Sequence, residues 1–103
     1  MSETVRVAIA RYLEEVDEHV VRPRYEKTAR VLSIFLEWLS EQNIADFSKL
    51  SEEHGCVFME RLIARFGEGS RDIAEAETVM KRFAKWVKRK EQAPALYAWF
   101  YKQ

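Results

Sequence analysis

The chain has 103 residues, and its 17 lysines and arginines balance its 17 aspartates and glutamates, so the formal net charge is zero. This length suits one domain, and 48% hydrophobic residues with three glycines and two prolines exclude a disordered or collagen-like chain. The single cysteine, Cys56, excludes an internal disulfide framework and a multi-thiolate metal site.

Apolar residues recur every three or four positions, which is the period of an α-helix, and nowhere alternate as in a β-strand. The spacing predicts a first helix that begins after Ser2 and ends near Val21. Pro23 suits the first turn of a second helix, which we expect to continue to about Gln42. Because residues 31–39 are mostly apolar, we expect this second helix to be deeply buried.

A connector over residues 43–50 follows the second helix. Three of its apolar residues are expected to pack under the core: Ile44, Phe47 and Leu50. Ser51 precedes two glutamates and indicates the N-cap of a third helix, which should run to about Phe66. Cys56 lies in an apolar stretch of this helix, where a thiol behaves as a small hydrophobic group, so we expect it to be buried.

The glycines and serine of residues 67–70 form the clearest break in the chain. Ser70 and Asp72 then indicate the start of a fourth helix that lasts until about Lys90. A short C-terminal segment after Pro94 is dense in apolar and aromatic residues and is expected to form one or two helical turns: Leu96, Tyr97, Trp99, Phe100 and Tyr101.

The second and fourth helices share a pattern, since VLSIFLEWL at residues 31–39 is echoed by VMKRFAKWV at residues 79–87. The whole order consists of a helix, a proline-containing turn, a helix ending in FLEWL, a short connector, a third helix, a Gly/Ser turn and a helix with FxxW. This order resembles the core-binding, SAM-like N-terminal domain of tyrosine recombinases and phage integrases, over roughly residues 3–90.

The resemblance implies an all-α, single-domain fold: an orthogonal four-helix bundle over residues 1–92, followed by an aromatic C-terminal tail or linker start over residues 93–103. In that family the domain holds duplex DNA through its second and fourth helices, while a separate catalytic domain cuts the DNA. The resemblance therefore implies that this chain is a DNA-binding domain that takes part in DNA integration or recombination. Its partners would be double-stranded DNA and either a recombinase catalytic domain or another protomer.

The candidate DNA contacts are cations in two clusters. The first lies at the start of the second helix, where cations oppose the helix dipole: Arg22, Arg24, Lys27 and Arg30. The second lies along the fourth helix: Lys81, Arg82, Lys85, Lys88, Arg89 and Lys90. Arg71 and Thr78 are candidates for base-edge or sugar contacts beside them. Cations near a helix C-terminus also complement the dipole, so the second cluster has a structural explanation as well.

We expect no enzymatic activity, because the chain lacks a recombinase catalytic domain. Its HxxR element, His19 to Arg22, falls at the end of the first helix, where we attribute it to chance. We also expect no metal site and no cofactor, because the sequence lacks ligands at structural-zinc spacing and a glycine-rich phosphate loop with its lysine. Since no apolar run approaches about 18 residues, we expect no membrane partner and a cytoplasmic location. An alternative function is a small helical protein–protein interaction module, a dimer or adaptor, that uses the aromatic tail.

Overall fold

The computed structural model describes residues 4–89 and 94–101. The five α-helices of this part are α1 (Val5–His19), α2 (Arg22–Glu41), α3 (Glu53–Phe66), α4 (Arg71–Arg89) and α5 (Pro94–Tyr101), and one 3-10 turn, η1 (Phe47–Lys49), joins α2 to α3. The described residues contain no β-strand, only an isolated bridge between Thr4 and Asp46. The predicted all-α bundle with a short C-terminal helix is confirmed.

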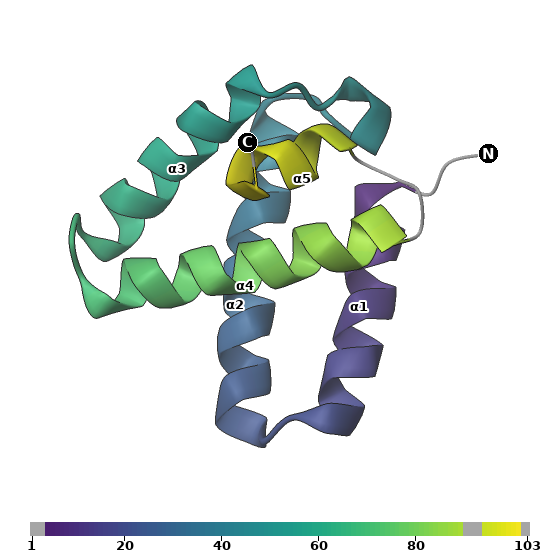
Figure 1. Cartoon of the computed structure of the whole chain (residues 1–103), viewed down its shortest axis with the longest axis vertical. Coiled ribbons are helices and arrows are strands. Elements are labelled where there is room, and N and C mark those ends of the chain that lie inside the picture. Colours follow the sequence, from purple (N-terminus) through teal and green to yellow (C-terminus); the bar gives the residue numbers. More distant parts are fainter. Residues whose placement is uncertain (1–3, 90–93, 102–103) are drawn as a thin grey trace.

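Figure 1 shows α1 and α2 side by side and running in opposite directions, with α4 crossing both of them. The third helix leads away from the connector and returns to α4 through the Gly/Ser turn. Helix α5 lies against α3 and α4 at the end of the bundle where α2 finishes. The boundary predicted after residue 92 falls outside the described residues, and the helix beyond it packs on the rest of the domain.

The core is built around aromatic side chains of α2. Phe35 lies 5.0 Å from Phe58 of α3 and 6.3 Å from Phe83 of α4, measured between ring centroids. Trp38 lies 5.3 Å from Phe58, and all four side chains are at most 1% exposed. The prediction that α2 is the buried helix is therefore confirmed.

The ends of the helices follow from local hydrogen bonds. Thr4 Oγ1 accepts a hydrogen bond from the Val7 amide and caps α1. Ser70 Oγ accepts from the Ile73 amide at 3.2 Å, which confirms that Ser70 opens α4. At the end of α2, Asn43 takes the left-handed conformation with a φ of 59°, which turns the chain into the connector.

The connector packs as predicted. Three of its side chains are at most 9% exposed: Ile44, Phe47 and Leu50. The Val5 amide donates a hydrogen bond to the Ala45 carbonyl at 3.0 Å, so the connector also holds the beginning of α1.

Two predictions for the third helix are wrong. Ser51 is not its N-cap, because the helix begins at Glu53 and the Ser51 amide donates to Nδ1 of His54 at 3.1 Å. Cys56 is exposed. The inward face of α3 consists of Gly55, Phe58 and Leu62, and a residue directly after Gly55 is rotated by about 100° toward solvent.

Trp99 of α5 occupies the space above Gly55. A Cβ atom on Gly55 would lie 2.8 Å from Cγ of the Trp99 ring. The Trp99 Nε1 group donates to the Ser51 carbonyl at 2.8 Å, and its ring lies 6.1 Å from that of Phe35. The C-terminal helix therefore contributes to the core.

We expect Gly55→Ala to destabilise the fold by about 1–3 kcal/mol, because the added methyl group overpacks against Trp99. Urea unfolding of the wild type and variant measures this loss. In the Trp99→Leu background the same change should be neutral or stabilising, because alanine favours a helix over glycine by about 1 kcal/mol once the clash is relieved. Equal losses in both backgrounds would show that the Trp99 ring is not what requires glycine.

Candidate functional site

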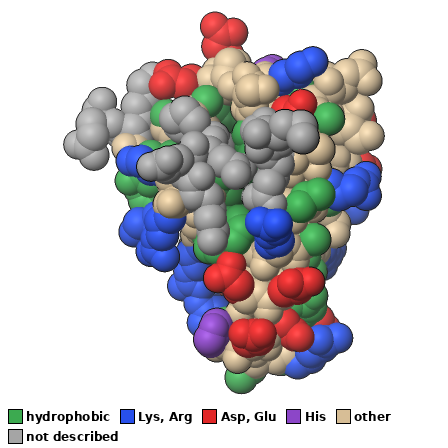
Figure 2. Space-filling view, turned by 90° about the vertical axis from the view of Figure 1, so that its right-hand side faces the viewer, with side chains coloured by type: hydrophobic (Ala, Val, Ile, Leu, Met, Phe, Trp, Pro, Cys, Tyr) green, Lys and Arg blue, Asp and Glu red, His purple; other side chains and the backbone are tan. Residues whose placement is uncertain are grey.

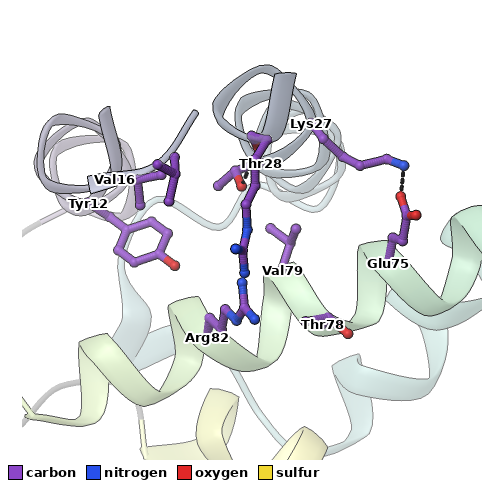
Figure 3. A pocket seen from close by; sticks show the side chains of 10 residues that line it. Tyr12, Val16, Lys27, Thr28, Glu75, Thr78, Val79 and Arg82 are labelled. Carbon is purple, nitrogen blue, oxygen red and sulfur yellow. Dashed lines mark hydrogen bonds and ion pairs between the residues drawn. The ribbon is translucent and has the colours of Figure 1, made fainter. Parts of the chain in front are cut away.

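A groove between α1, α2 and α4 combines apolar and charged side chains from three helices and has a volume of about 440 Å³ (Figure 3). Figure 1 shows α4 crossing α1 and α2 above the end where these two helices are joined, and the groove lies between the three helices. Ten residues line it: Tyr12, Val16, Val20, Arg24, Lys27, Thr28, Glu75, Thr78, Val79 and Arg82.

Tyr12 forms part of the groove wall on α1. Its ring packs 5.2 Å from Phe83 and 5.4 Å from Trp86, and Figure 3 shows its hydroxyl directed into the groove toward Arg82. Burial raises the pKa of the Tyr12 phenol, and the positive charge of Arg24 partly opposes this effect. The hydroxyl is therefore a neutral group that can donate or accept a hydrogen bond in the groove.

Arg24 and Arg82 bring two positive charges to the groove from α2 and α4. Both side chains are exposed, and within residues 4–89 and 94–101 neither has a carboxylate at ion-pair distance. The Thr28 hydroxyl donates to the Arg24 carbonyl at 3.0 Å and holds the first turns of α2 beside them.

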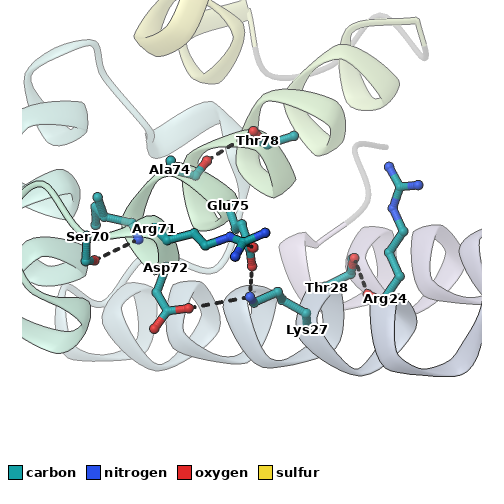
Figure 4. A network of polar contacts seen from close by, with 10 residues as sticks. Arg24, Lys27, Thr28, Ser70, Arg71, Asp72, Ala74, Glu75 and Thr78 are labelled. Atoms are coloured by element: carbon teal, nitrogen blue, oxygen red, sulfur yellow. Dashed lines mark hydrogen bonds and ion pairs between the residues drawn. The ribbon is translucent and has the colours of Figure 1, made fainter.

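Lys27 and Arg71 are placed differently, because the acidic start of α4 neutralises them (Figure 4). Lys27 forms an ion pair with Glu75 and lies 3.5 Å from a carboxylate oxygen of Asp72. Arg71 Nε lies 3.6 Å from the other oxygen of Glu75. Figure 4 shows Arg24 pointing away from this network.

Two further cations of the first cluster also lie apart from the groove. Arg22 contacts Asp17 at 3.5 Å and Glu26 at 3.6 Å. Arg30 stacks over the Phe66 ring on the side of α2 that faces α3, with 5.6 Å between its guanidinium carbon and the ring centroid. The structure therefore divides the first cluster and leaves Arg24 beside α4.

The second cluster lies along α4, where α5 borders it. Lys81 pairs with Glu77 at 3.5 Å, and its carbonyl accepts from the Tyr101 hydroxyl at 3.5 Å. Lys88 lies 3.8 Å from the centre of the Tyr97 ring, and Lys85 lies 5.6 Å from that of Tyr101. A cation–π contact orients an ammonium group but leaves its positive charge in place.

Five exposed cations therefore remain without a carboxylate partner in the described part of α2 and α4, and we call them the cationic strip: Arg24, Arg82, Lys85, Lys88 and Arg89. Lys90, which the sequence added to this run, lies outside the described residues. Figure 2 shows basic side chains gathered along one edge of the molecule and acidic side chains over the lower half of α1.

The sequence pattern indicated the cations of this region but not the groove. Thr78, which was predicted to lie beside the cations, is also part of the groove wall. Its hydroxyl donates to the Ala74 carbonyl at 3.0 Å. Tyr12, Val16 and Val79 were visible only as members of apolar helix faces. Their exposure depends on the angle at which α4 crosses, which helical spacing does not report.

No group of three or more His, Cys, Asp or Glu side chains in residues 4–89 and 94–101 is arranged to hold a metal ion. None of the described helices has the length and apolar character needed to cross a bilayer.

Comparison with known proteins found no matching family model, no matching curated protein and no matching solved structure.

The raised pKa of Tyr12 predicts that its phenol ionises above the ordinary tyrosine value of about 10. Because the neutral form is favoured in the folded state, the resulting stabilisation is present below about pH 10 and is lost as pH rises through the folded-state pKa. Subtracting the alkaline phenolate absorbance titration of Tyr12→Phe from that of the wild type isolates this group. A difference titration with its midpoint at or below that of free tyrosine would show that the ring is solvated.

Proposed function

We propose that this domain binds nucleic acid, with duplex DNA as its partner, through the cationic strip. The observation that carries the proposal is the sorting of charge: the chain has equal numbers of acids and bases, yet five neighbouring cations lack acidic partners among the described residues. Phosphates of a nucleic-acid backbone are the partners that such a row of exposed cations recognises.

The strip is costly for the isolated protein. Arg82 and Lys85 are three residues apart and Lys85 and Arg89 are four apart, so both pairs are neighbours on α4. Like charges at these spacings destabilise a helix by about 0.2–0.5 kcal/mol per pair. A bound polyanion would offset this repulsion between the cations, whereas cations that remain exposed to solvent keep it.

The helix dipole explains only part of the strip. Lys88 and Arg89 lie in the last turn of α4, where positive charge is favourable. Arg82 lies in the middle of α4, and Arg24 lies in the first turn of α2, where positive charge is unfavourable. The dipole therefore does not explain the two cations that share the groove, nor Lys85, which lies before the last turn of α4.

The resemblance to recombinase core-binding domains supports the same partner, because it assigns DNA contact to the second and fourth helices. In this proposal the chain supplies DNA binding for recombination or integration in the cytoplasm, without catalysing the reaction. A catalytic domain or a second protomer would contact the same DNA. Because it is joined to this domain, its contact with the DNA would be intramolecular, which raises the overall affinity.

Titration of a mixed-sequence duplex by fluorescence anisotropy at several salt concentrations tests the proposal. Five phosphate contacts predict a slope of about −4 to −5 for log K against log salt concentration. The absence of salt-dependent binding at low ionic strength would contradict the proposal.

The variant Arg82→Ala/Arg89→Ala should weaken binding to all sequences and make the slope shallower by about 2. A matched control is Arg6→Ala/Lys49→Ala, which removes the same charge from exposed positions of α1 and η1 outside the strip. If both double variants lose affinity equally, net charge and not the strip determines binding.

A second candidate function is self-association through the side of α3 that α5 borders. Five side chains line a depression of about 410 Å³ there, flanked by Glu52 and Glu60: Cys56, Met59, Ile63, Ala98 and Trp99. The tail aromatics themselves are half-buried, so this depression, and not a free tail, is the apolar surface that the structure offers.

Self-association predicts a dimer whose population rises with protein concentration and which Ile63→Glu converts to monomer, because the new carboxylate would be buried at the contact. Light scattering after size-exclusion chromatography measures both states. A wild-type monomer at every concentration would contradict this second function.

A further inference from the structure

Part of the groove wall is apolar, and binding of DNA phosphates to the cationic strip would leave this part without a contact. Val16 of α1, Val20 directly after α1 and Val79 of α4 line it beside the Tyr12 ring. In a regular duplex the phosphates lie outside and the base faces are covered by their stacked neighbours, so a duplex offers sugars and thymine methyl groups but no base face to fill such a groove.

The two ends of the groove differ in charge. Glu75 and Arg82 are seven residues apart on α4, which is about 10 Å along the helix axis. Glu75 and its partner Lys27 form one end, and Figure 3 shows Arg82 at the other. Arg24, which also lines the groove, points away from Lys27 and Glu75 (Figure 4), and within the described residues neither arginine has a carboxylate partner. An anionic group is thus favoured only at the arginine end.

The polar groups between these ends suit the edge of a planar heterocycle. The Tyr12 hydroxyl can donate or accept, and the Glu75 carboxylate can accept from an N–H group on the edge of a base, such as the ring N–H of thymine. The oxygens of Thr28 and Thr78, whose protons are donated to backbone carbonyls, still have acceptor capacity. The volume of about 440 Å³ falls within the range of about 300–1,000 Å³ that is usual for small-ligand pockets.

We infer that the groove between α1, α2 and α4 receives one unpaired nucleotide, with its base against Tyr12, Val16 and Val79 and its phosphate on Arg24 and Arg82. Base faces bind apolar and aromatic walls and the planes of guanidinium groups, and only an unstacked base exposes them. The inference rests on the proposed nucleic-acid binding and adds to it a preference for the junction of a duplex with a single strand.

The test compares three DNA probes of one duplex sequence at constant salt: a blunt duplex, the same duplex with a short thymidine overhang, and the same overhang with abasic sites. Anisotropy should show about tenfold tighter binding of the thymidine overhang than of the blunt duplex, in line with the usual contribution of one stacked base. The abasic overhang carries the same phosphates, so it should lose most of this gain.

Val16→Trp fills the groove without changing any charge. It should abolish the preference for the thymidine overhang and leave blunt-duplex affinity unchanged. The matched control is Val7→Trp, which makes the same substitution on α1 at a side chain that is 44% exposed outside the groove. Thr78→Trp, at an exposed position of α4 on the groove wall, provides a second filling variant if Val16→Trp does not fold.

The outcomes separate the two proposals. Salt-dependent binding in which all three probes are equal, or in which the abasic overhang binds as tightly as the thymidine overhang, overturns the groove as a nucleotide site and leaves the cationic strip in place. Failure of every probe to bind at low salt overturns both. Loss of the overhang preference in Val16→Trp but not in Val7→Trp supports the groove.

Discussion

The packing of the Phe83 side chain joins α4 to α1, α2 and the connector, and the groove and the cationic strip both depend on this packing. This fully buried ring of α4 contacts Tyr12 of α1, Phe35 of α2 and Phe47 of the connector, at centroid distances of 5.2, 6.3 and 6.4 Å. Its position between the antiparallel helices makes α4 cross both of them. The crossing buries one side of α4, opens the groove beside Tyr12 and leaves the opposite side to solvent.

The same crossing sorts the charges of α4. Its first turns contact the first half of α2, where Asp72 and Glu75 neutralise Lys27. Farther along, the helix faces the start of α2 across the groove and then passes α5, and no carboxylate of the described residues reaches Arg82 or Lys85 there. Charge that balances over the whole chain is therefore unbalanced over one edge of its surface. This local imbalance, and not net charge, underlies the proposed affinity for a polyanion.

The C-terminal helix connects the core to that edge. Trp99 closes the aromatic cluster above Gly55, while Tyr97 and Tyr101 lie under the ammonium groups of Lys88 and Lys85. Because Trp99 fixes α5 to the core, the two tyrosine rings of α5 hold the long, flexible side chains of Lys85 and Lys88 near one orientation. Ordering them in the free protein reduces the conformational entropy that binding would otherwise cost.

The helices, the buried face of α2, the packing of the connector and the break before α4 could all be predicted from the sequence, because these features depend on local spacing, caps and turn residues. It placed Cys56 wrongly because an apolar stretch of α3 does not reveal which of its residues faces inward. The pairing of Lys27 with an acid could not be predicted in this way, because Lys27 and Glu75 are far apart in the chain and become adjacent only when α4 packs on α2. The groove also results from contacts between residues far apart in the chain. Its walls come from α1, α2 and α4, and its width depends on the angle at which these helices cross around the buried Phe83 ring.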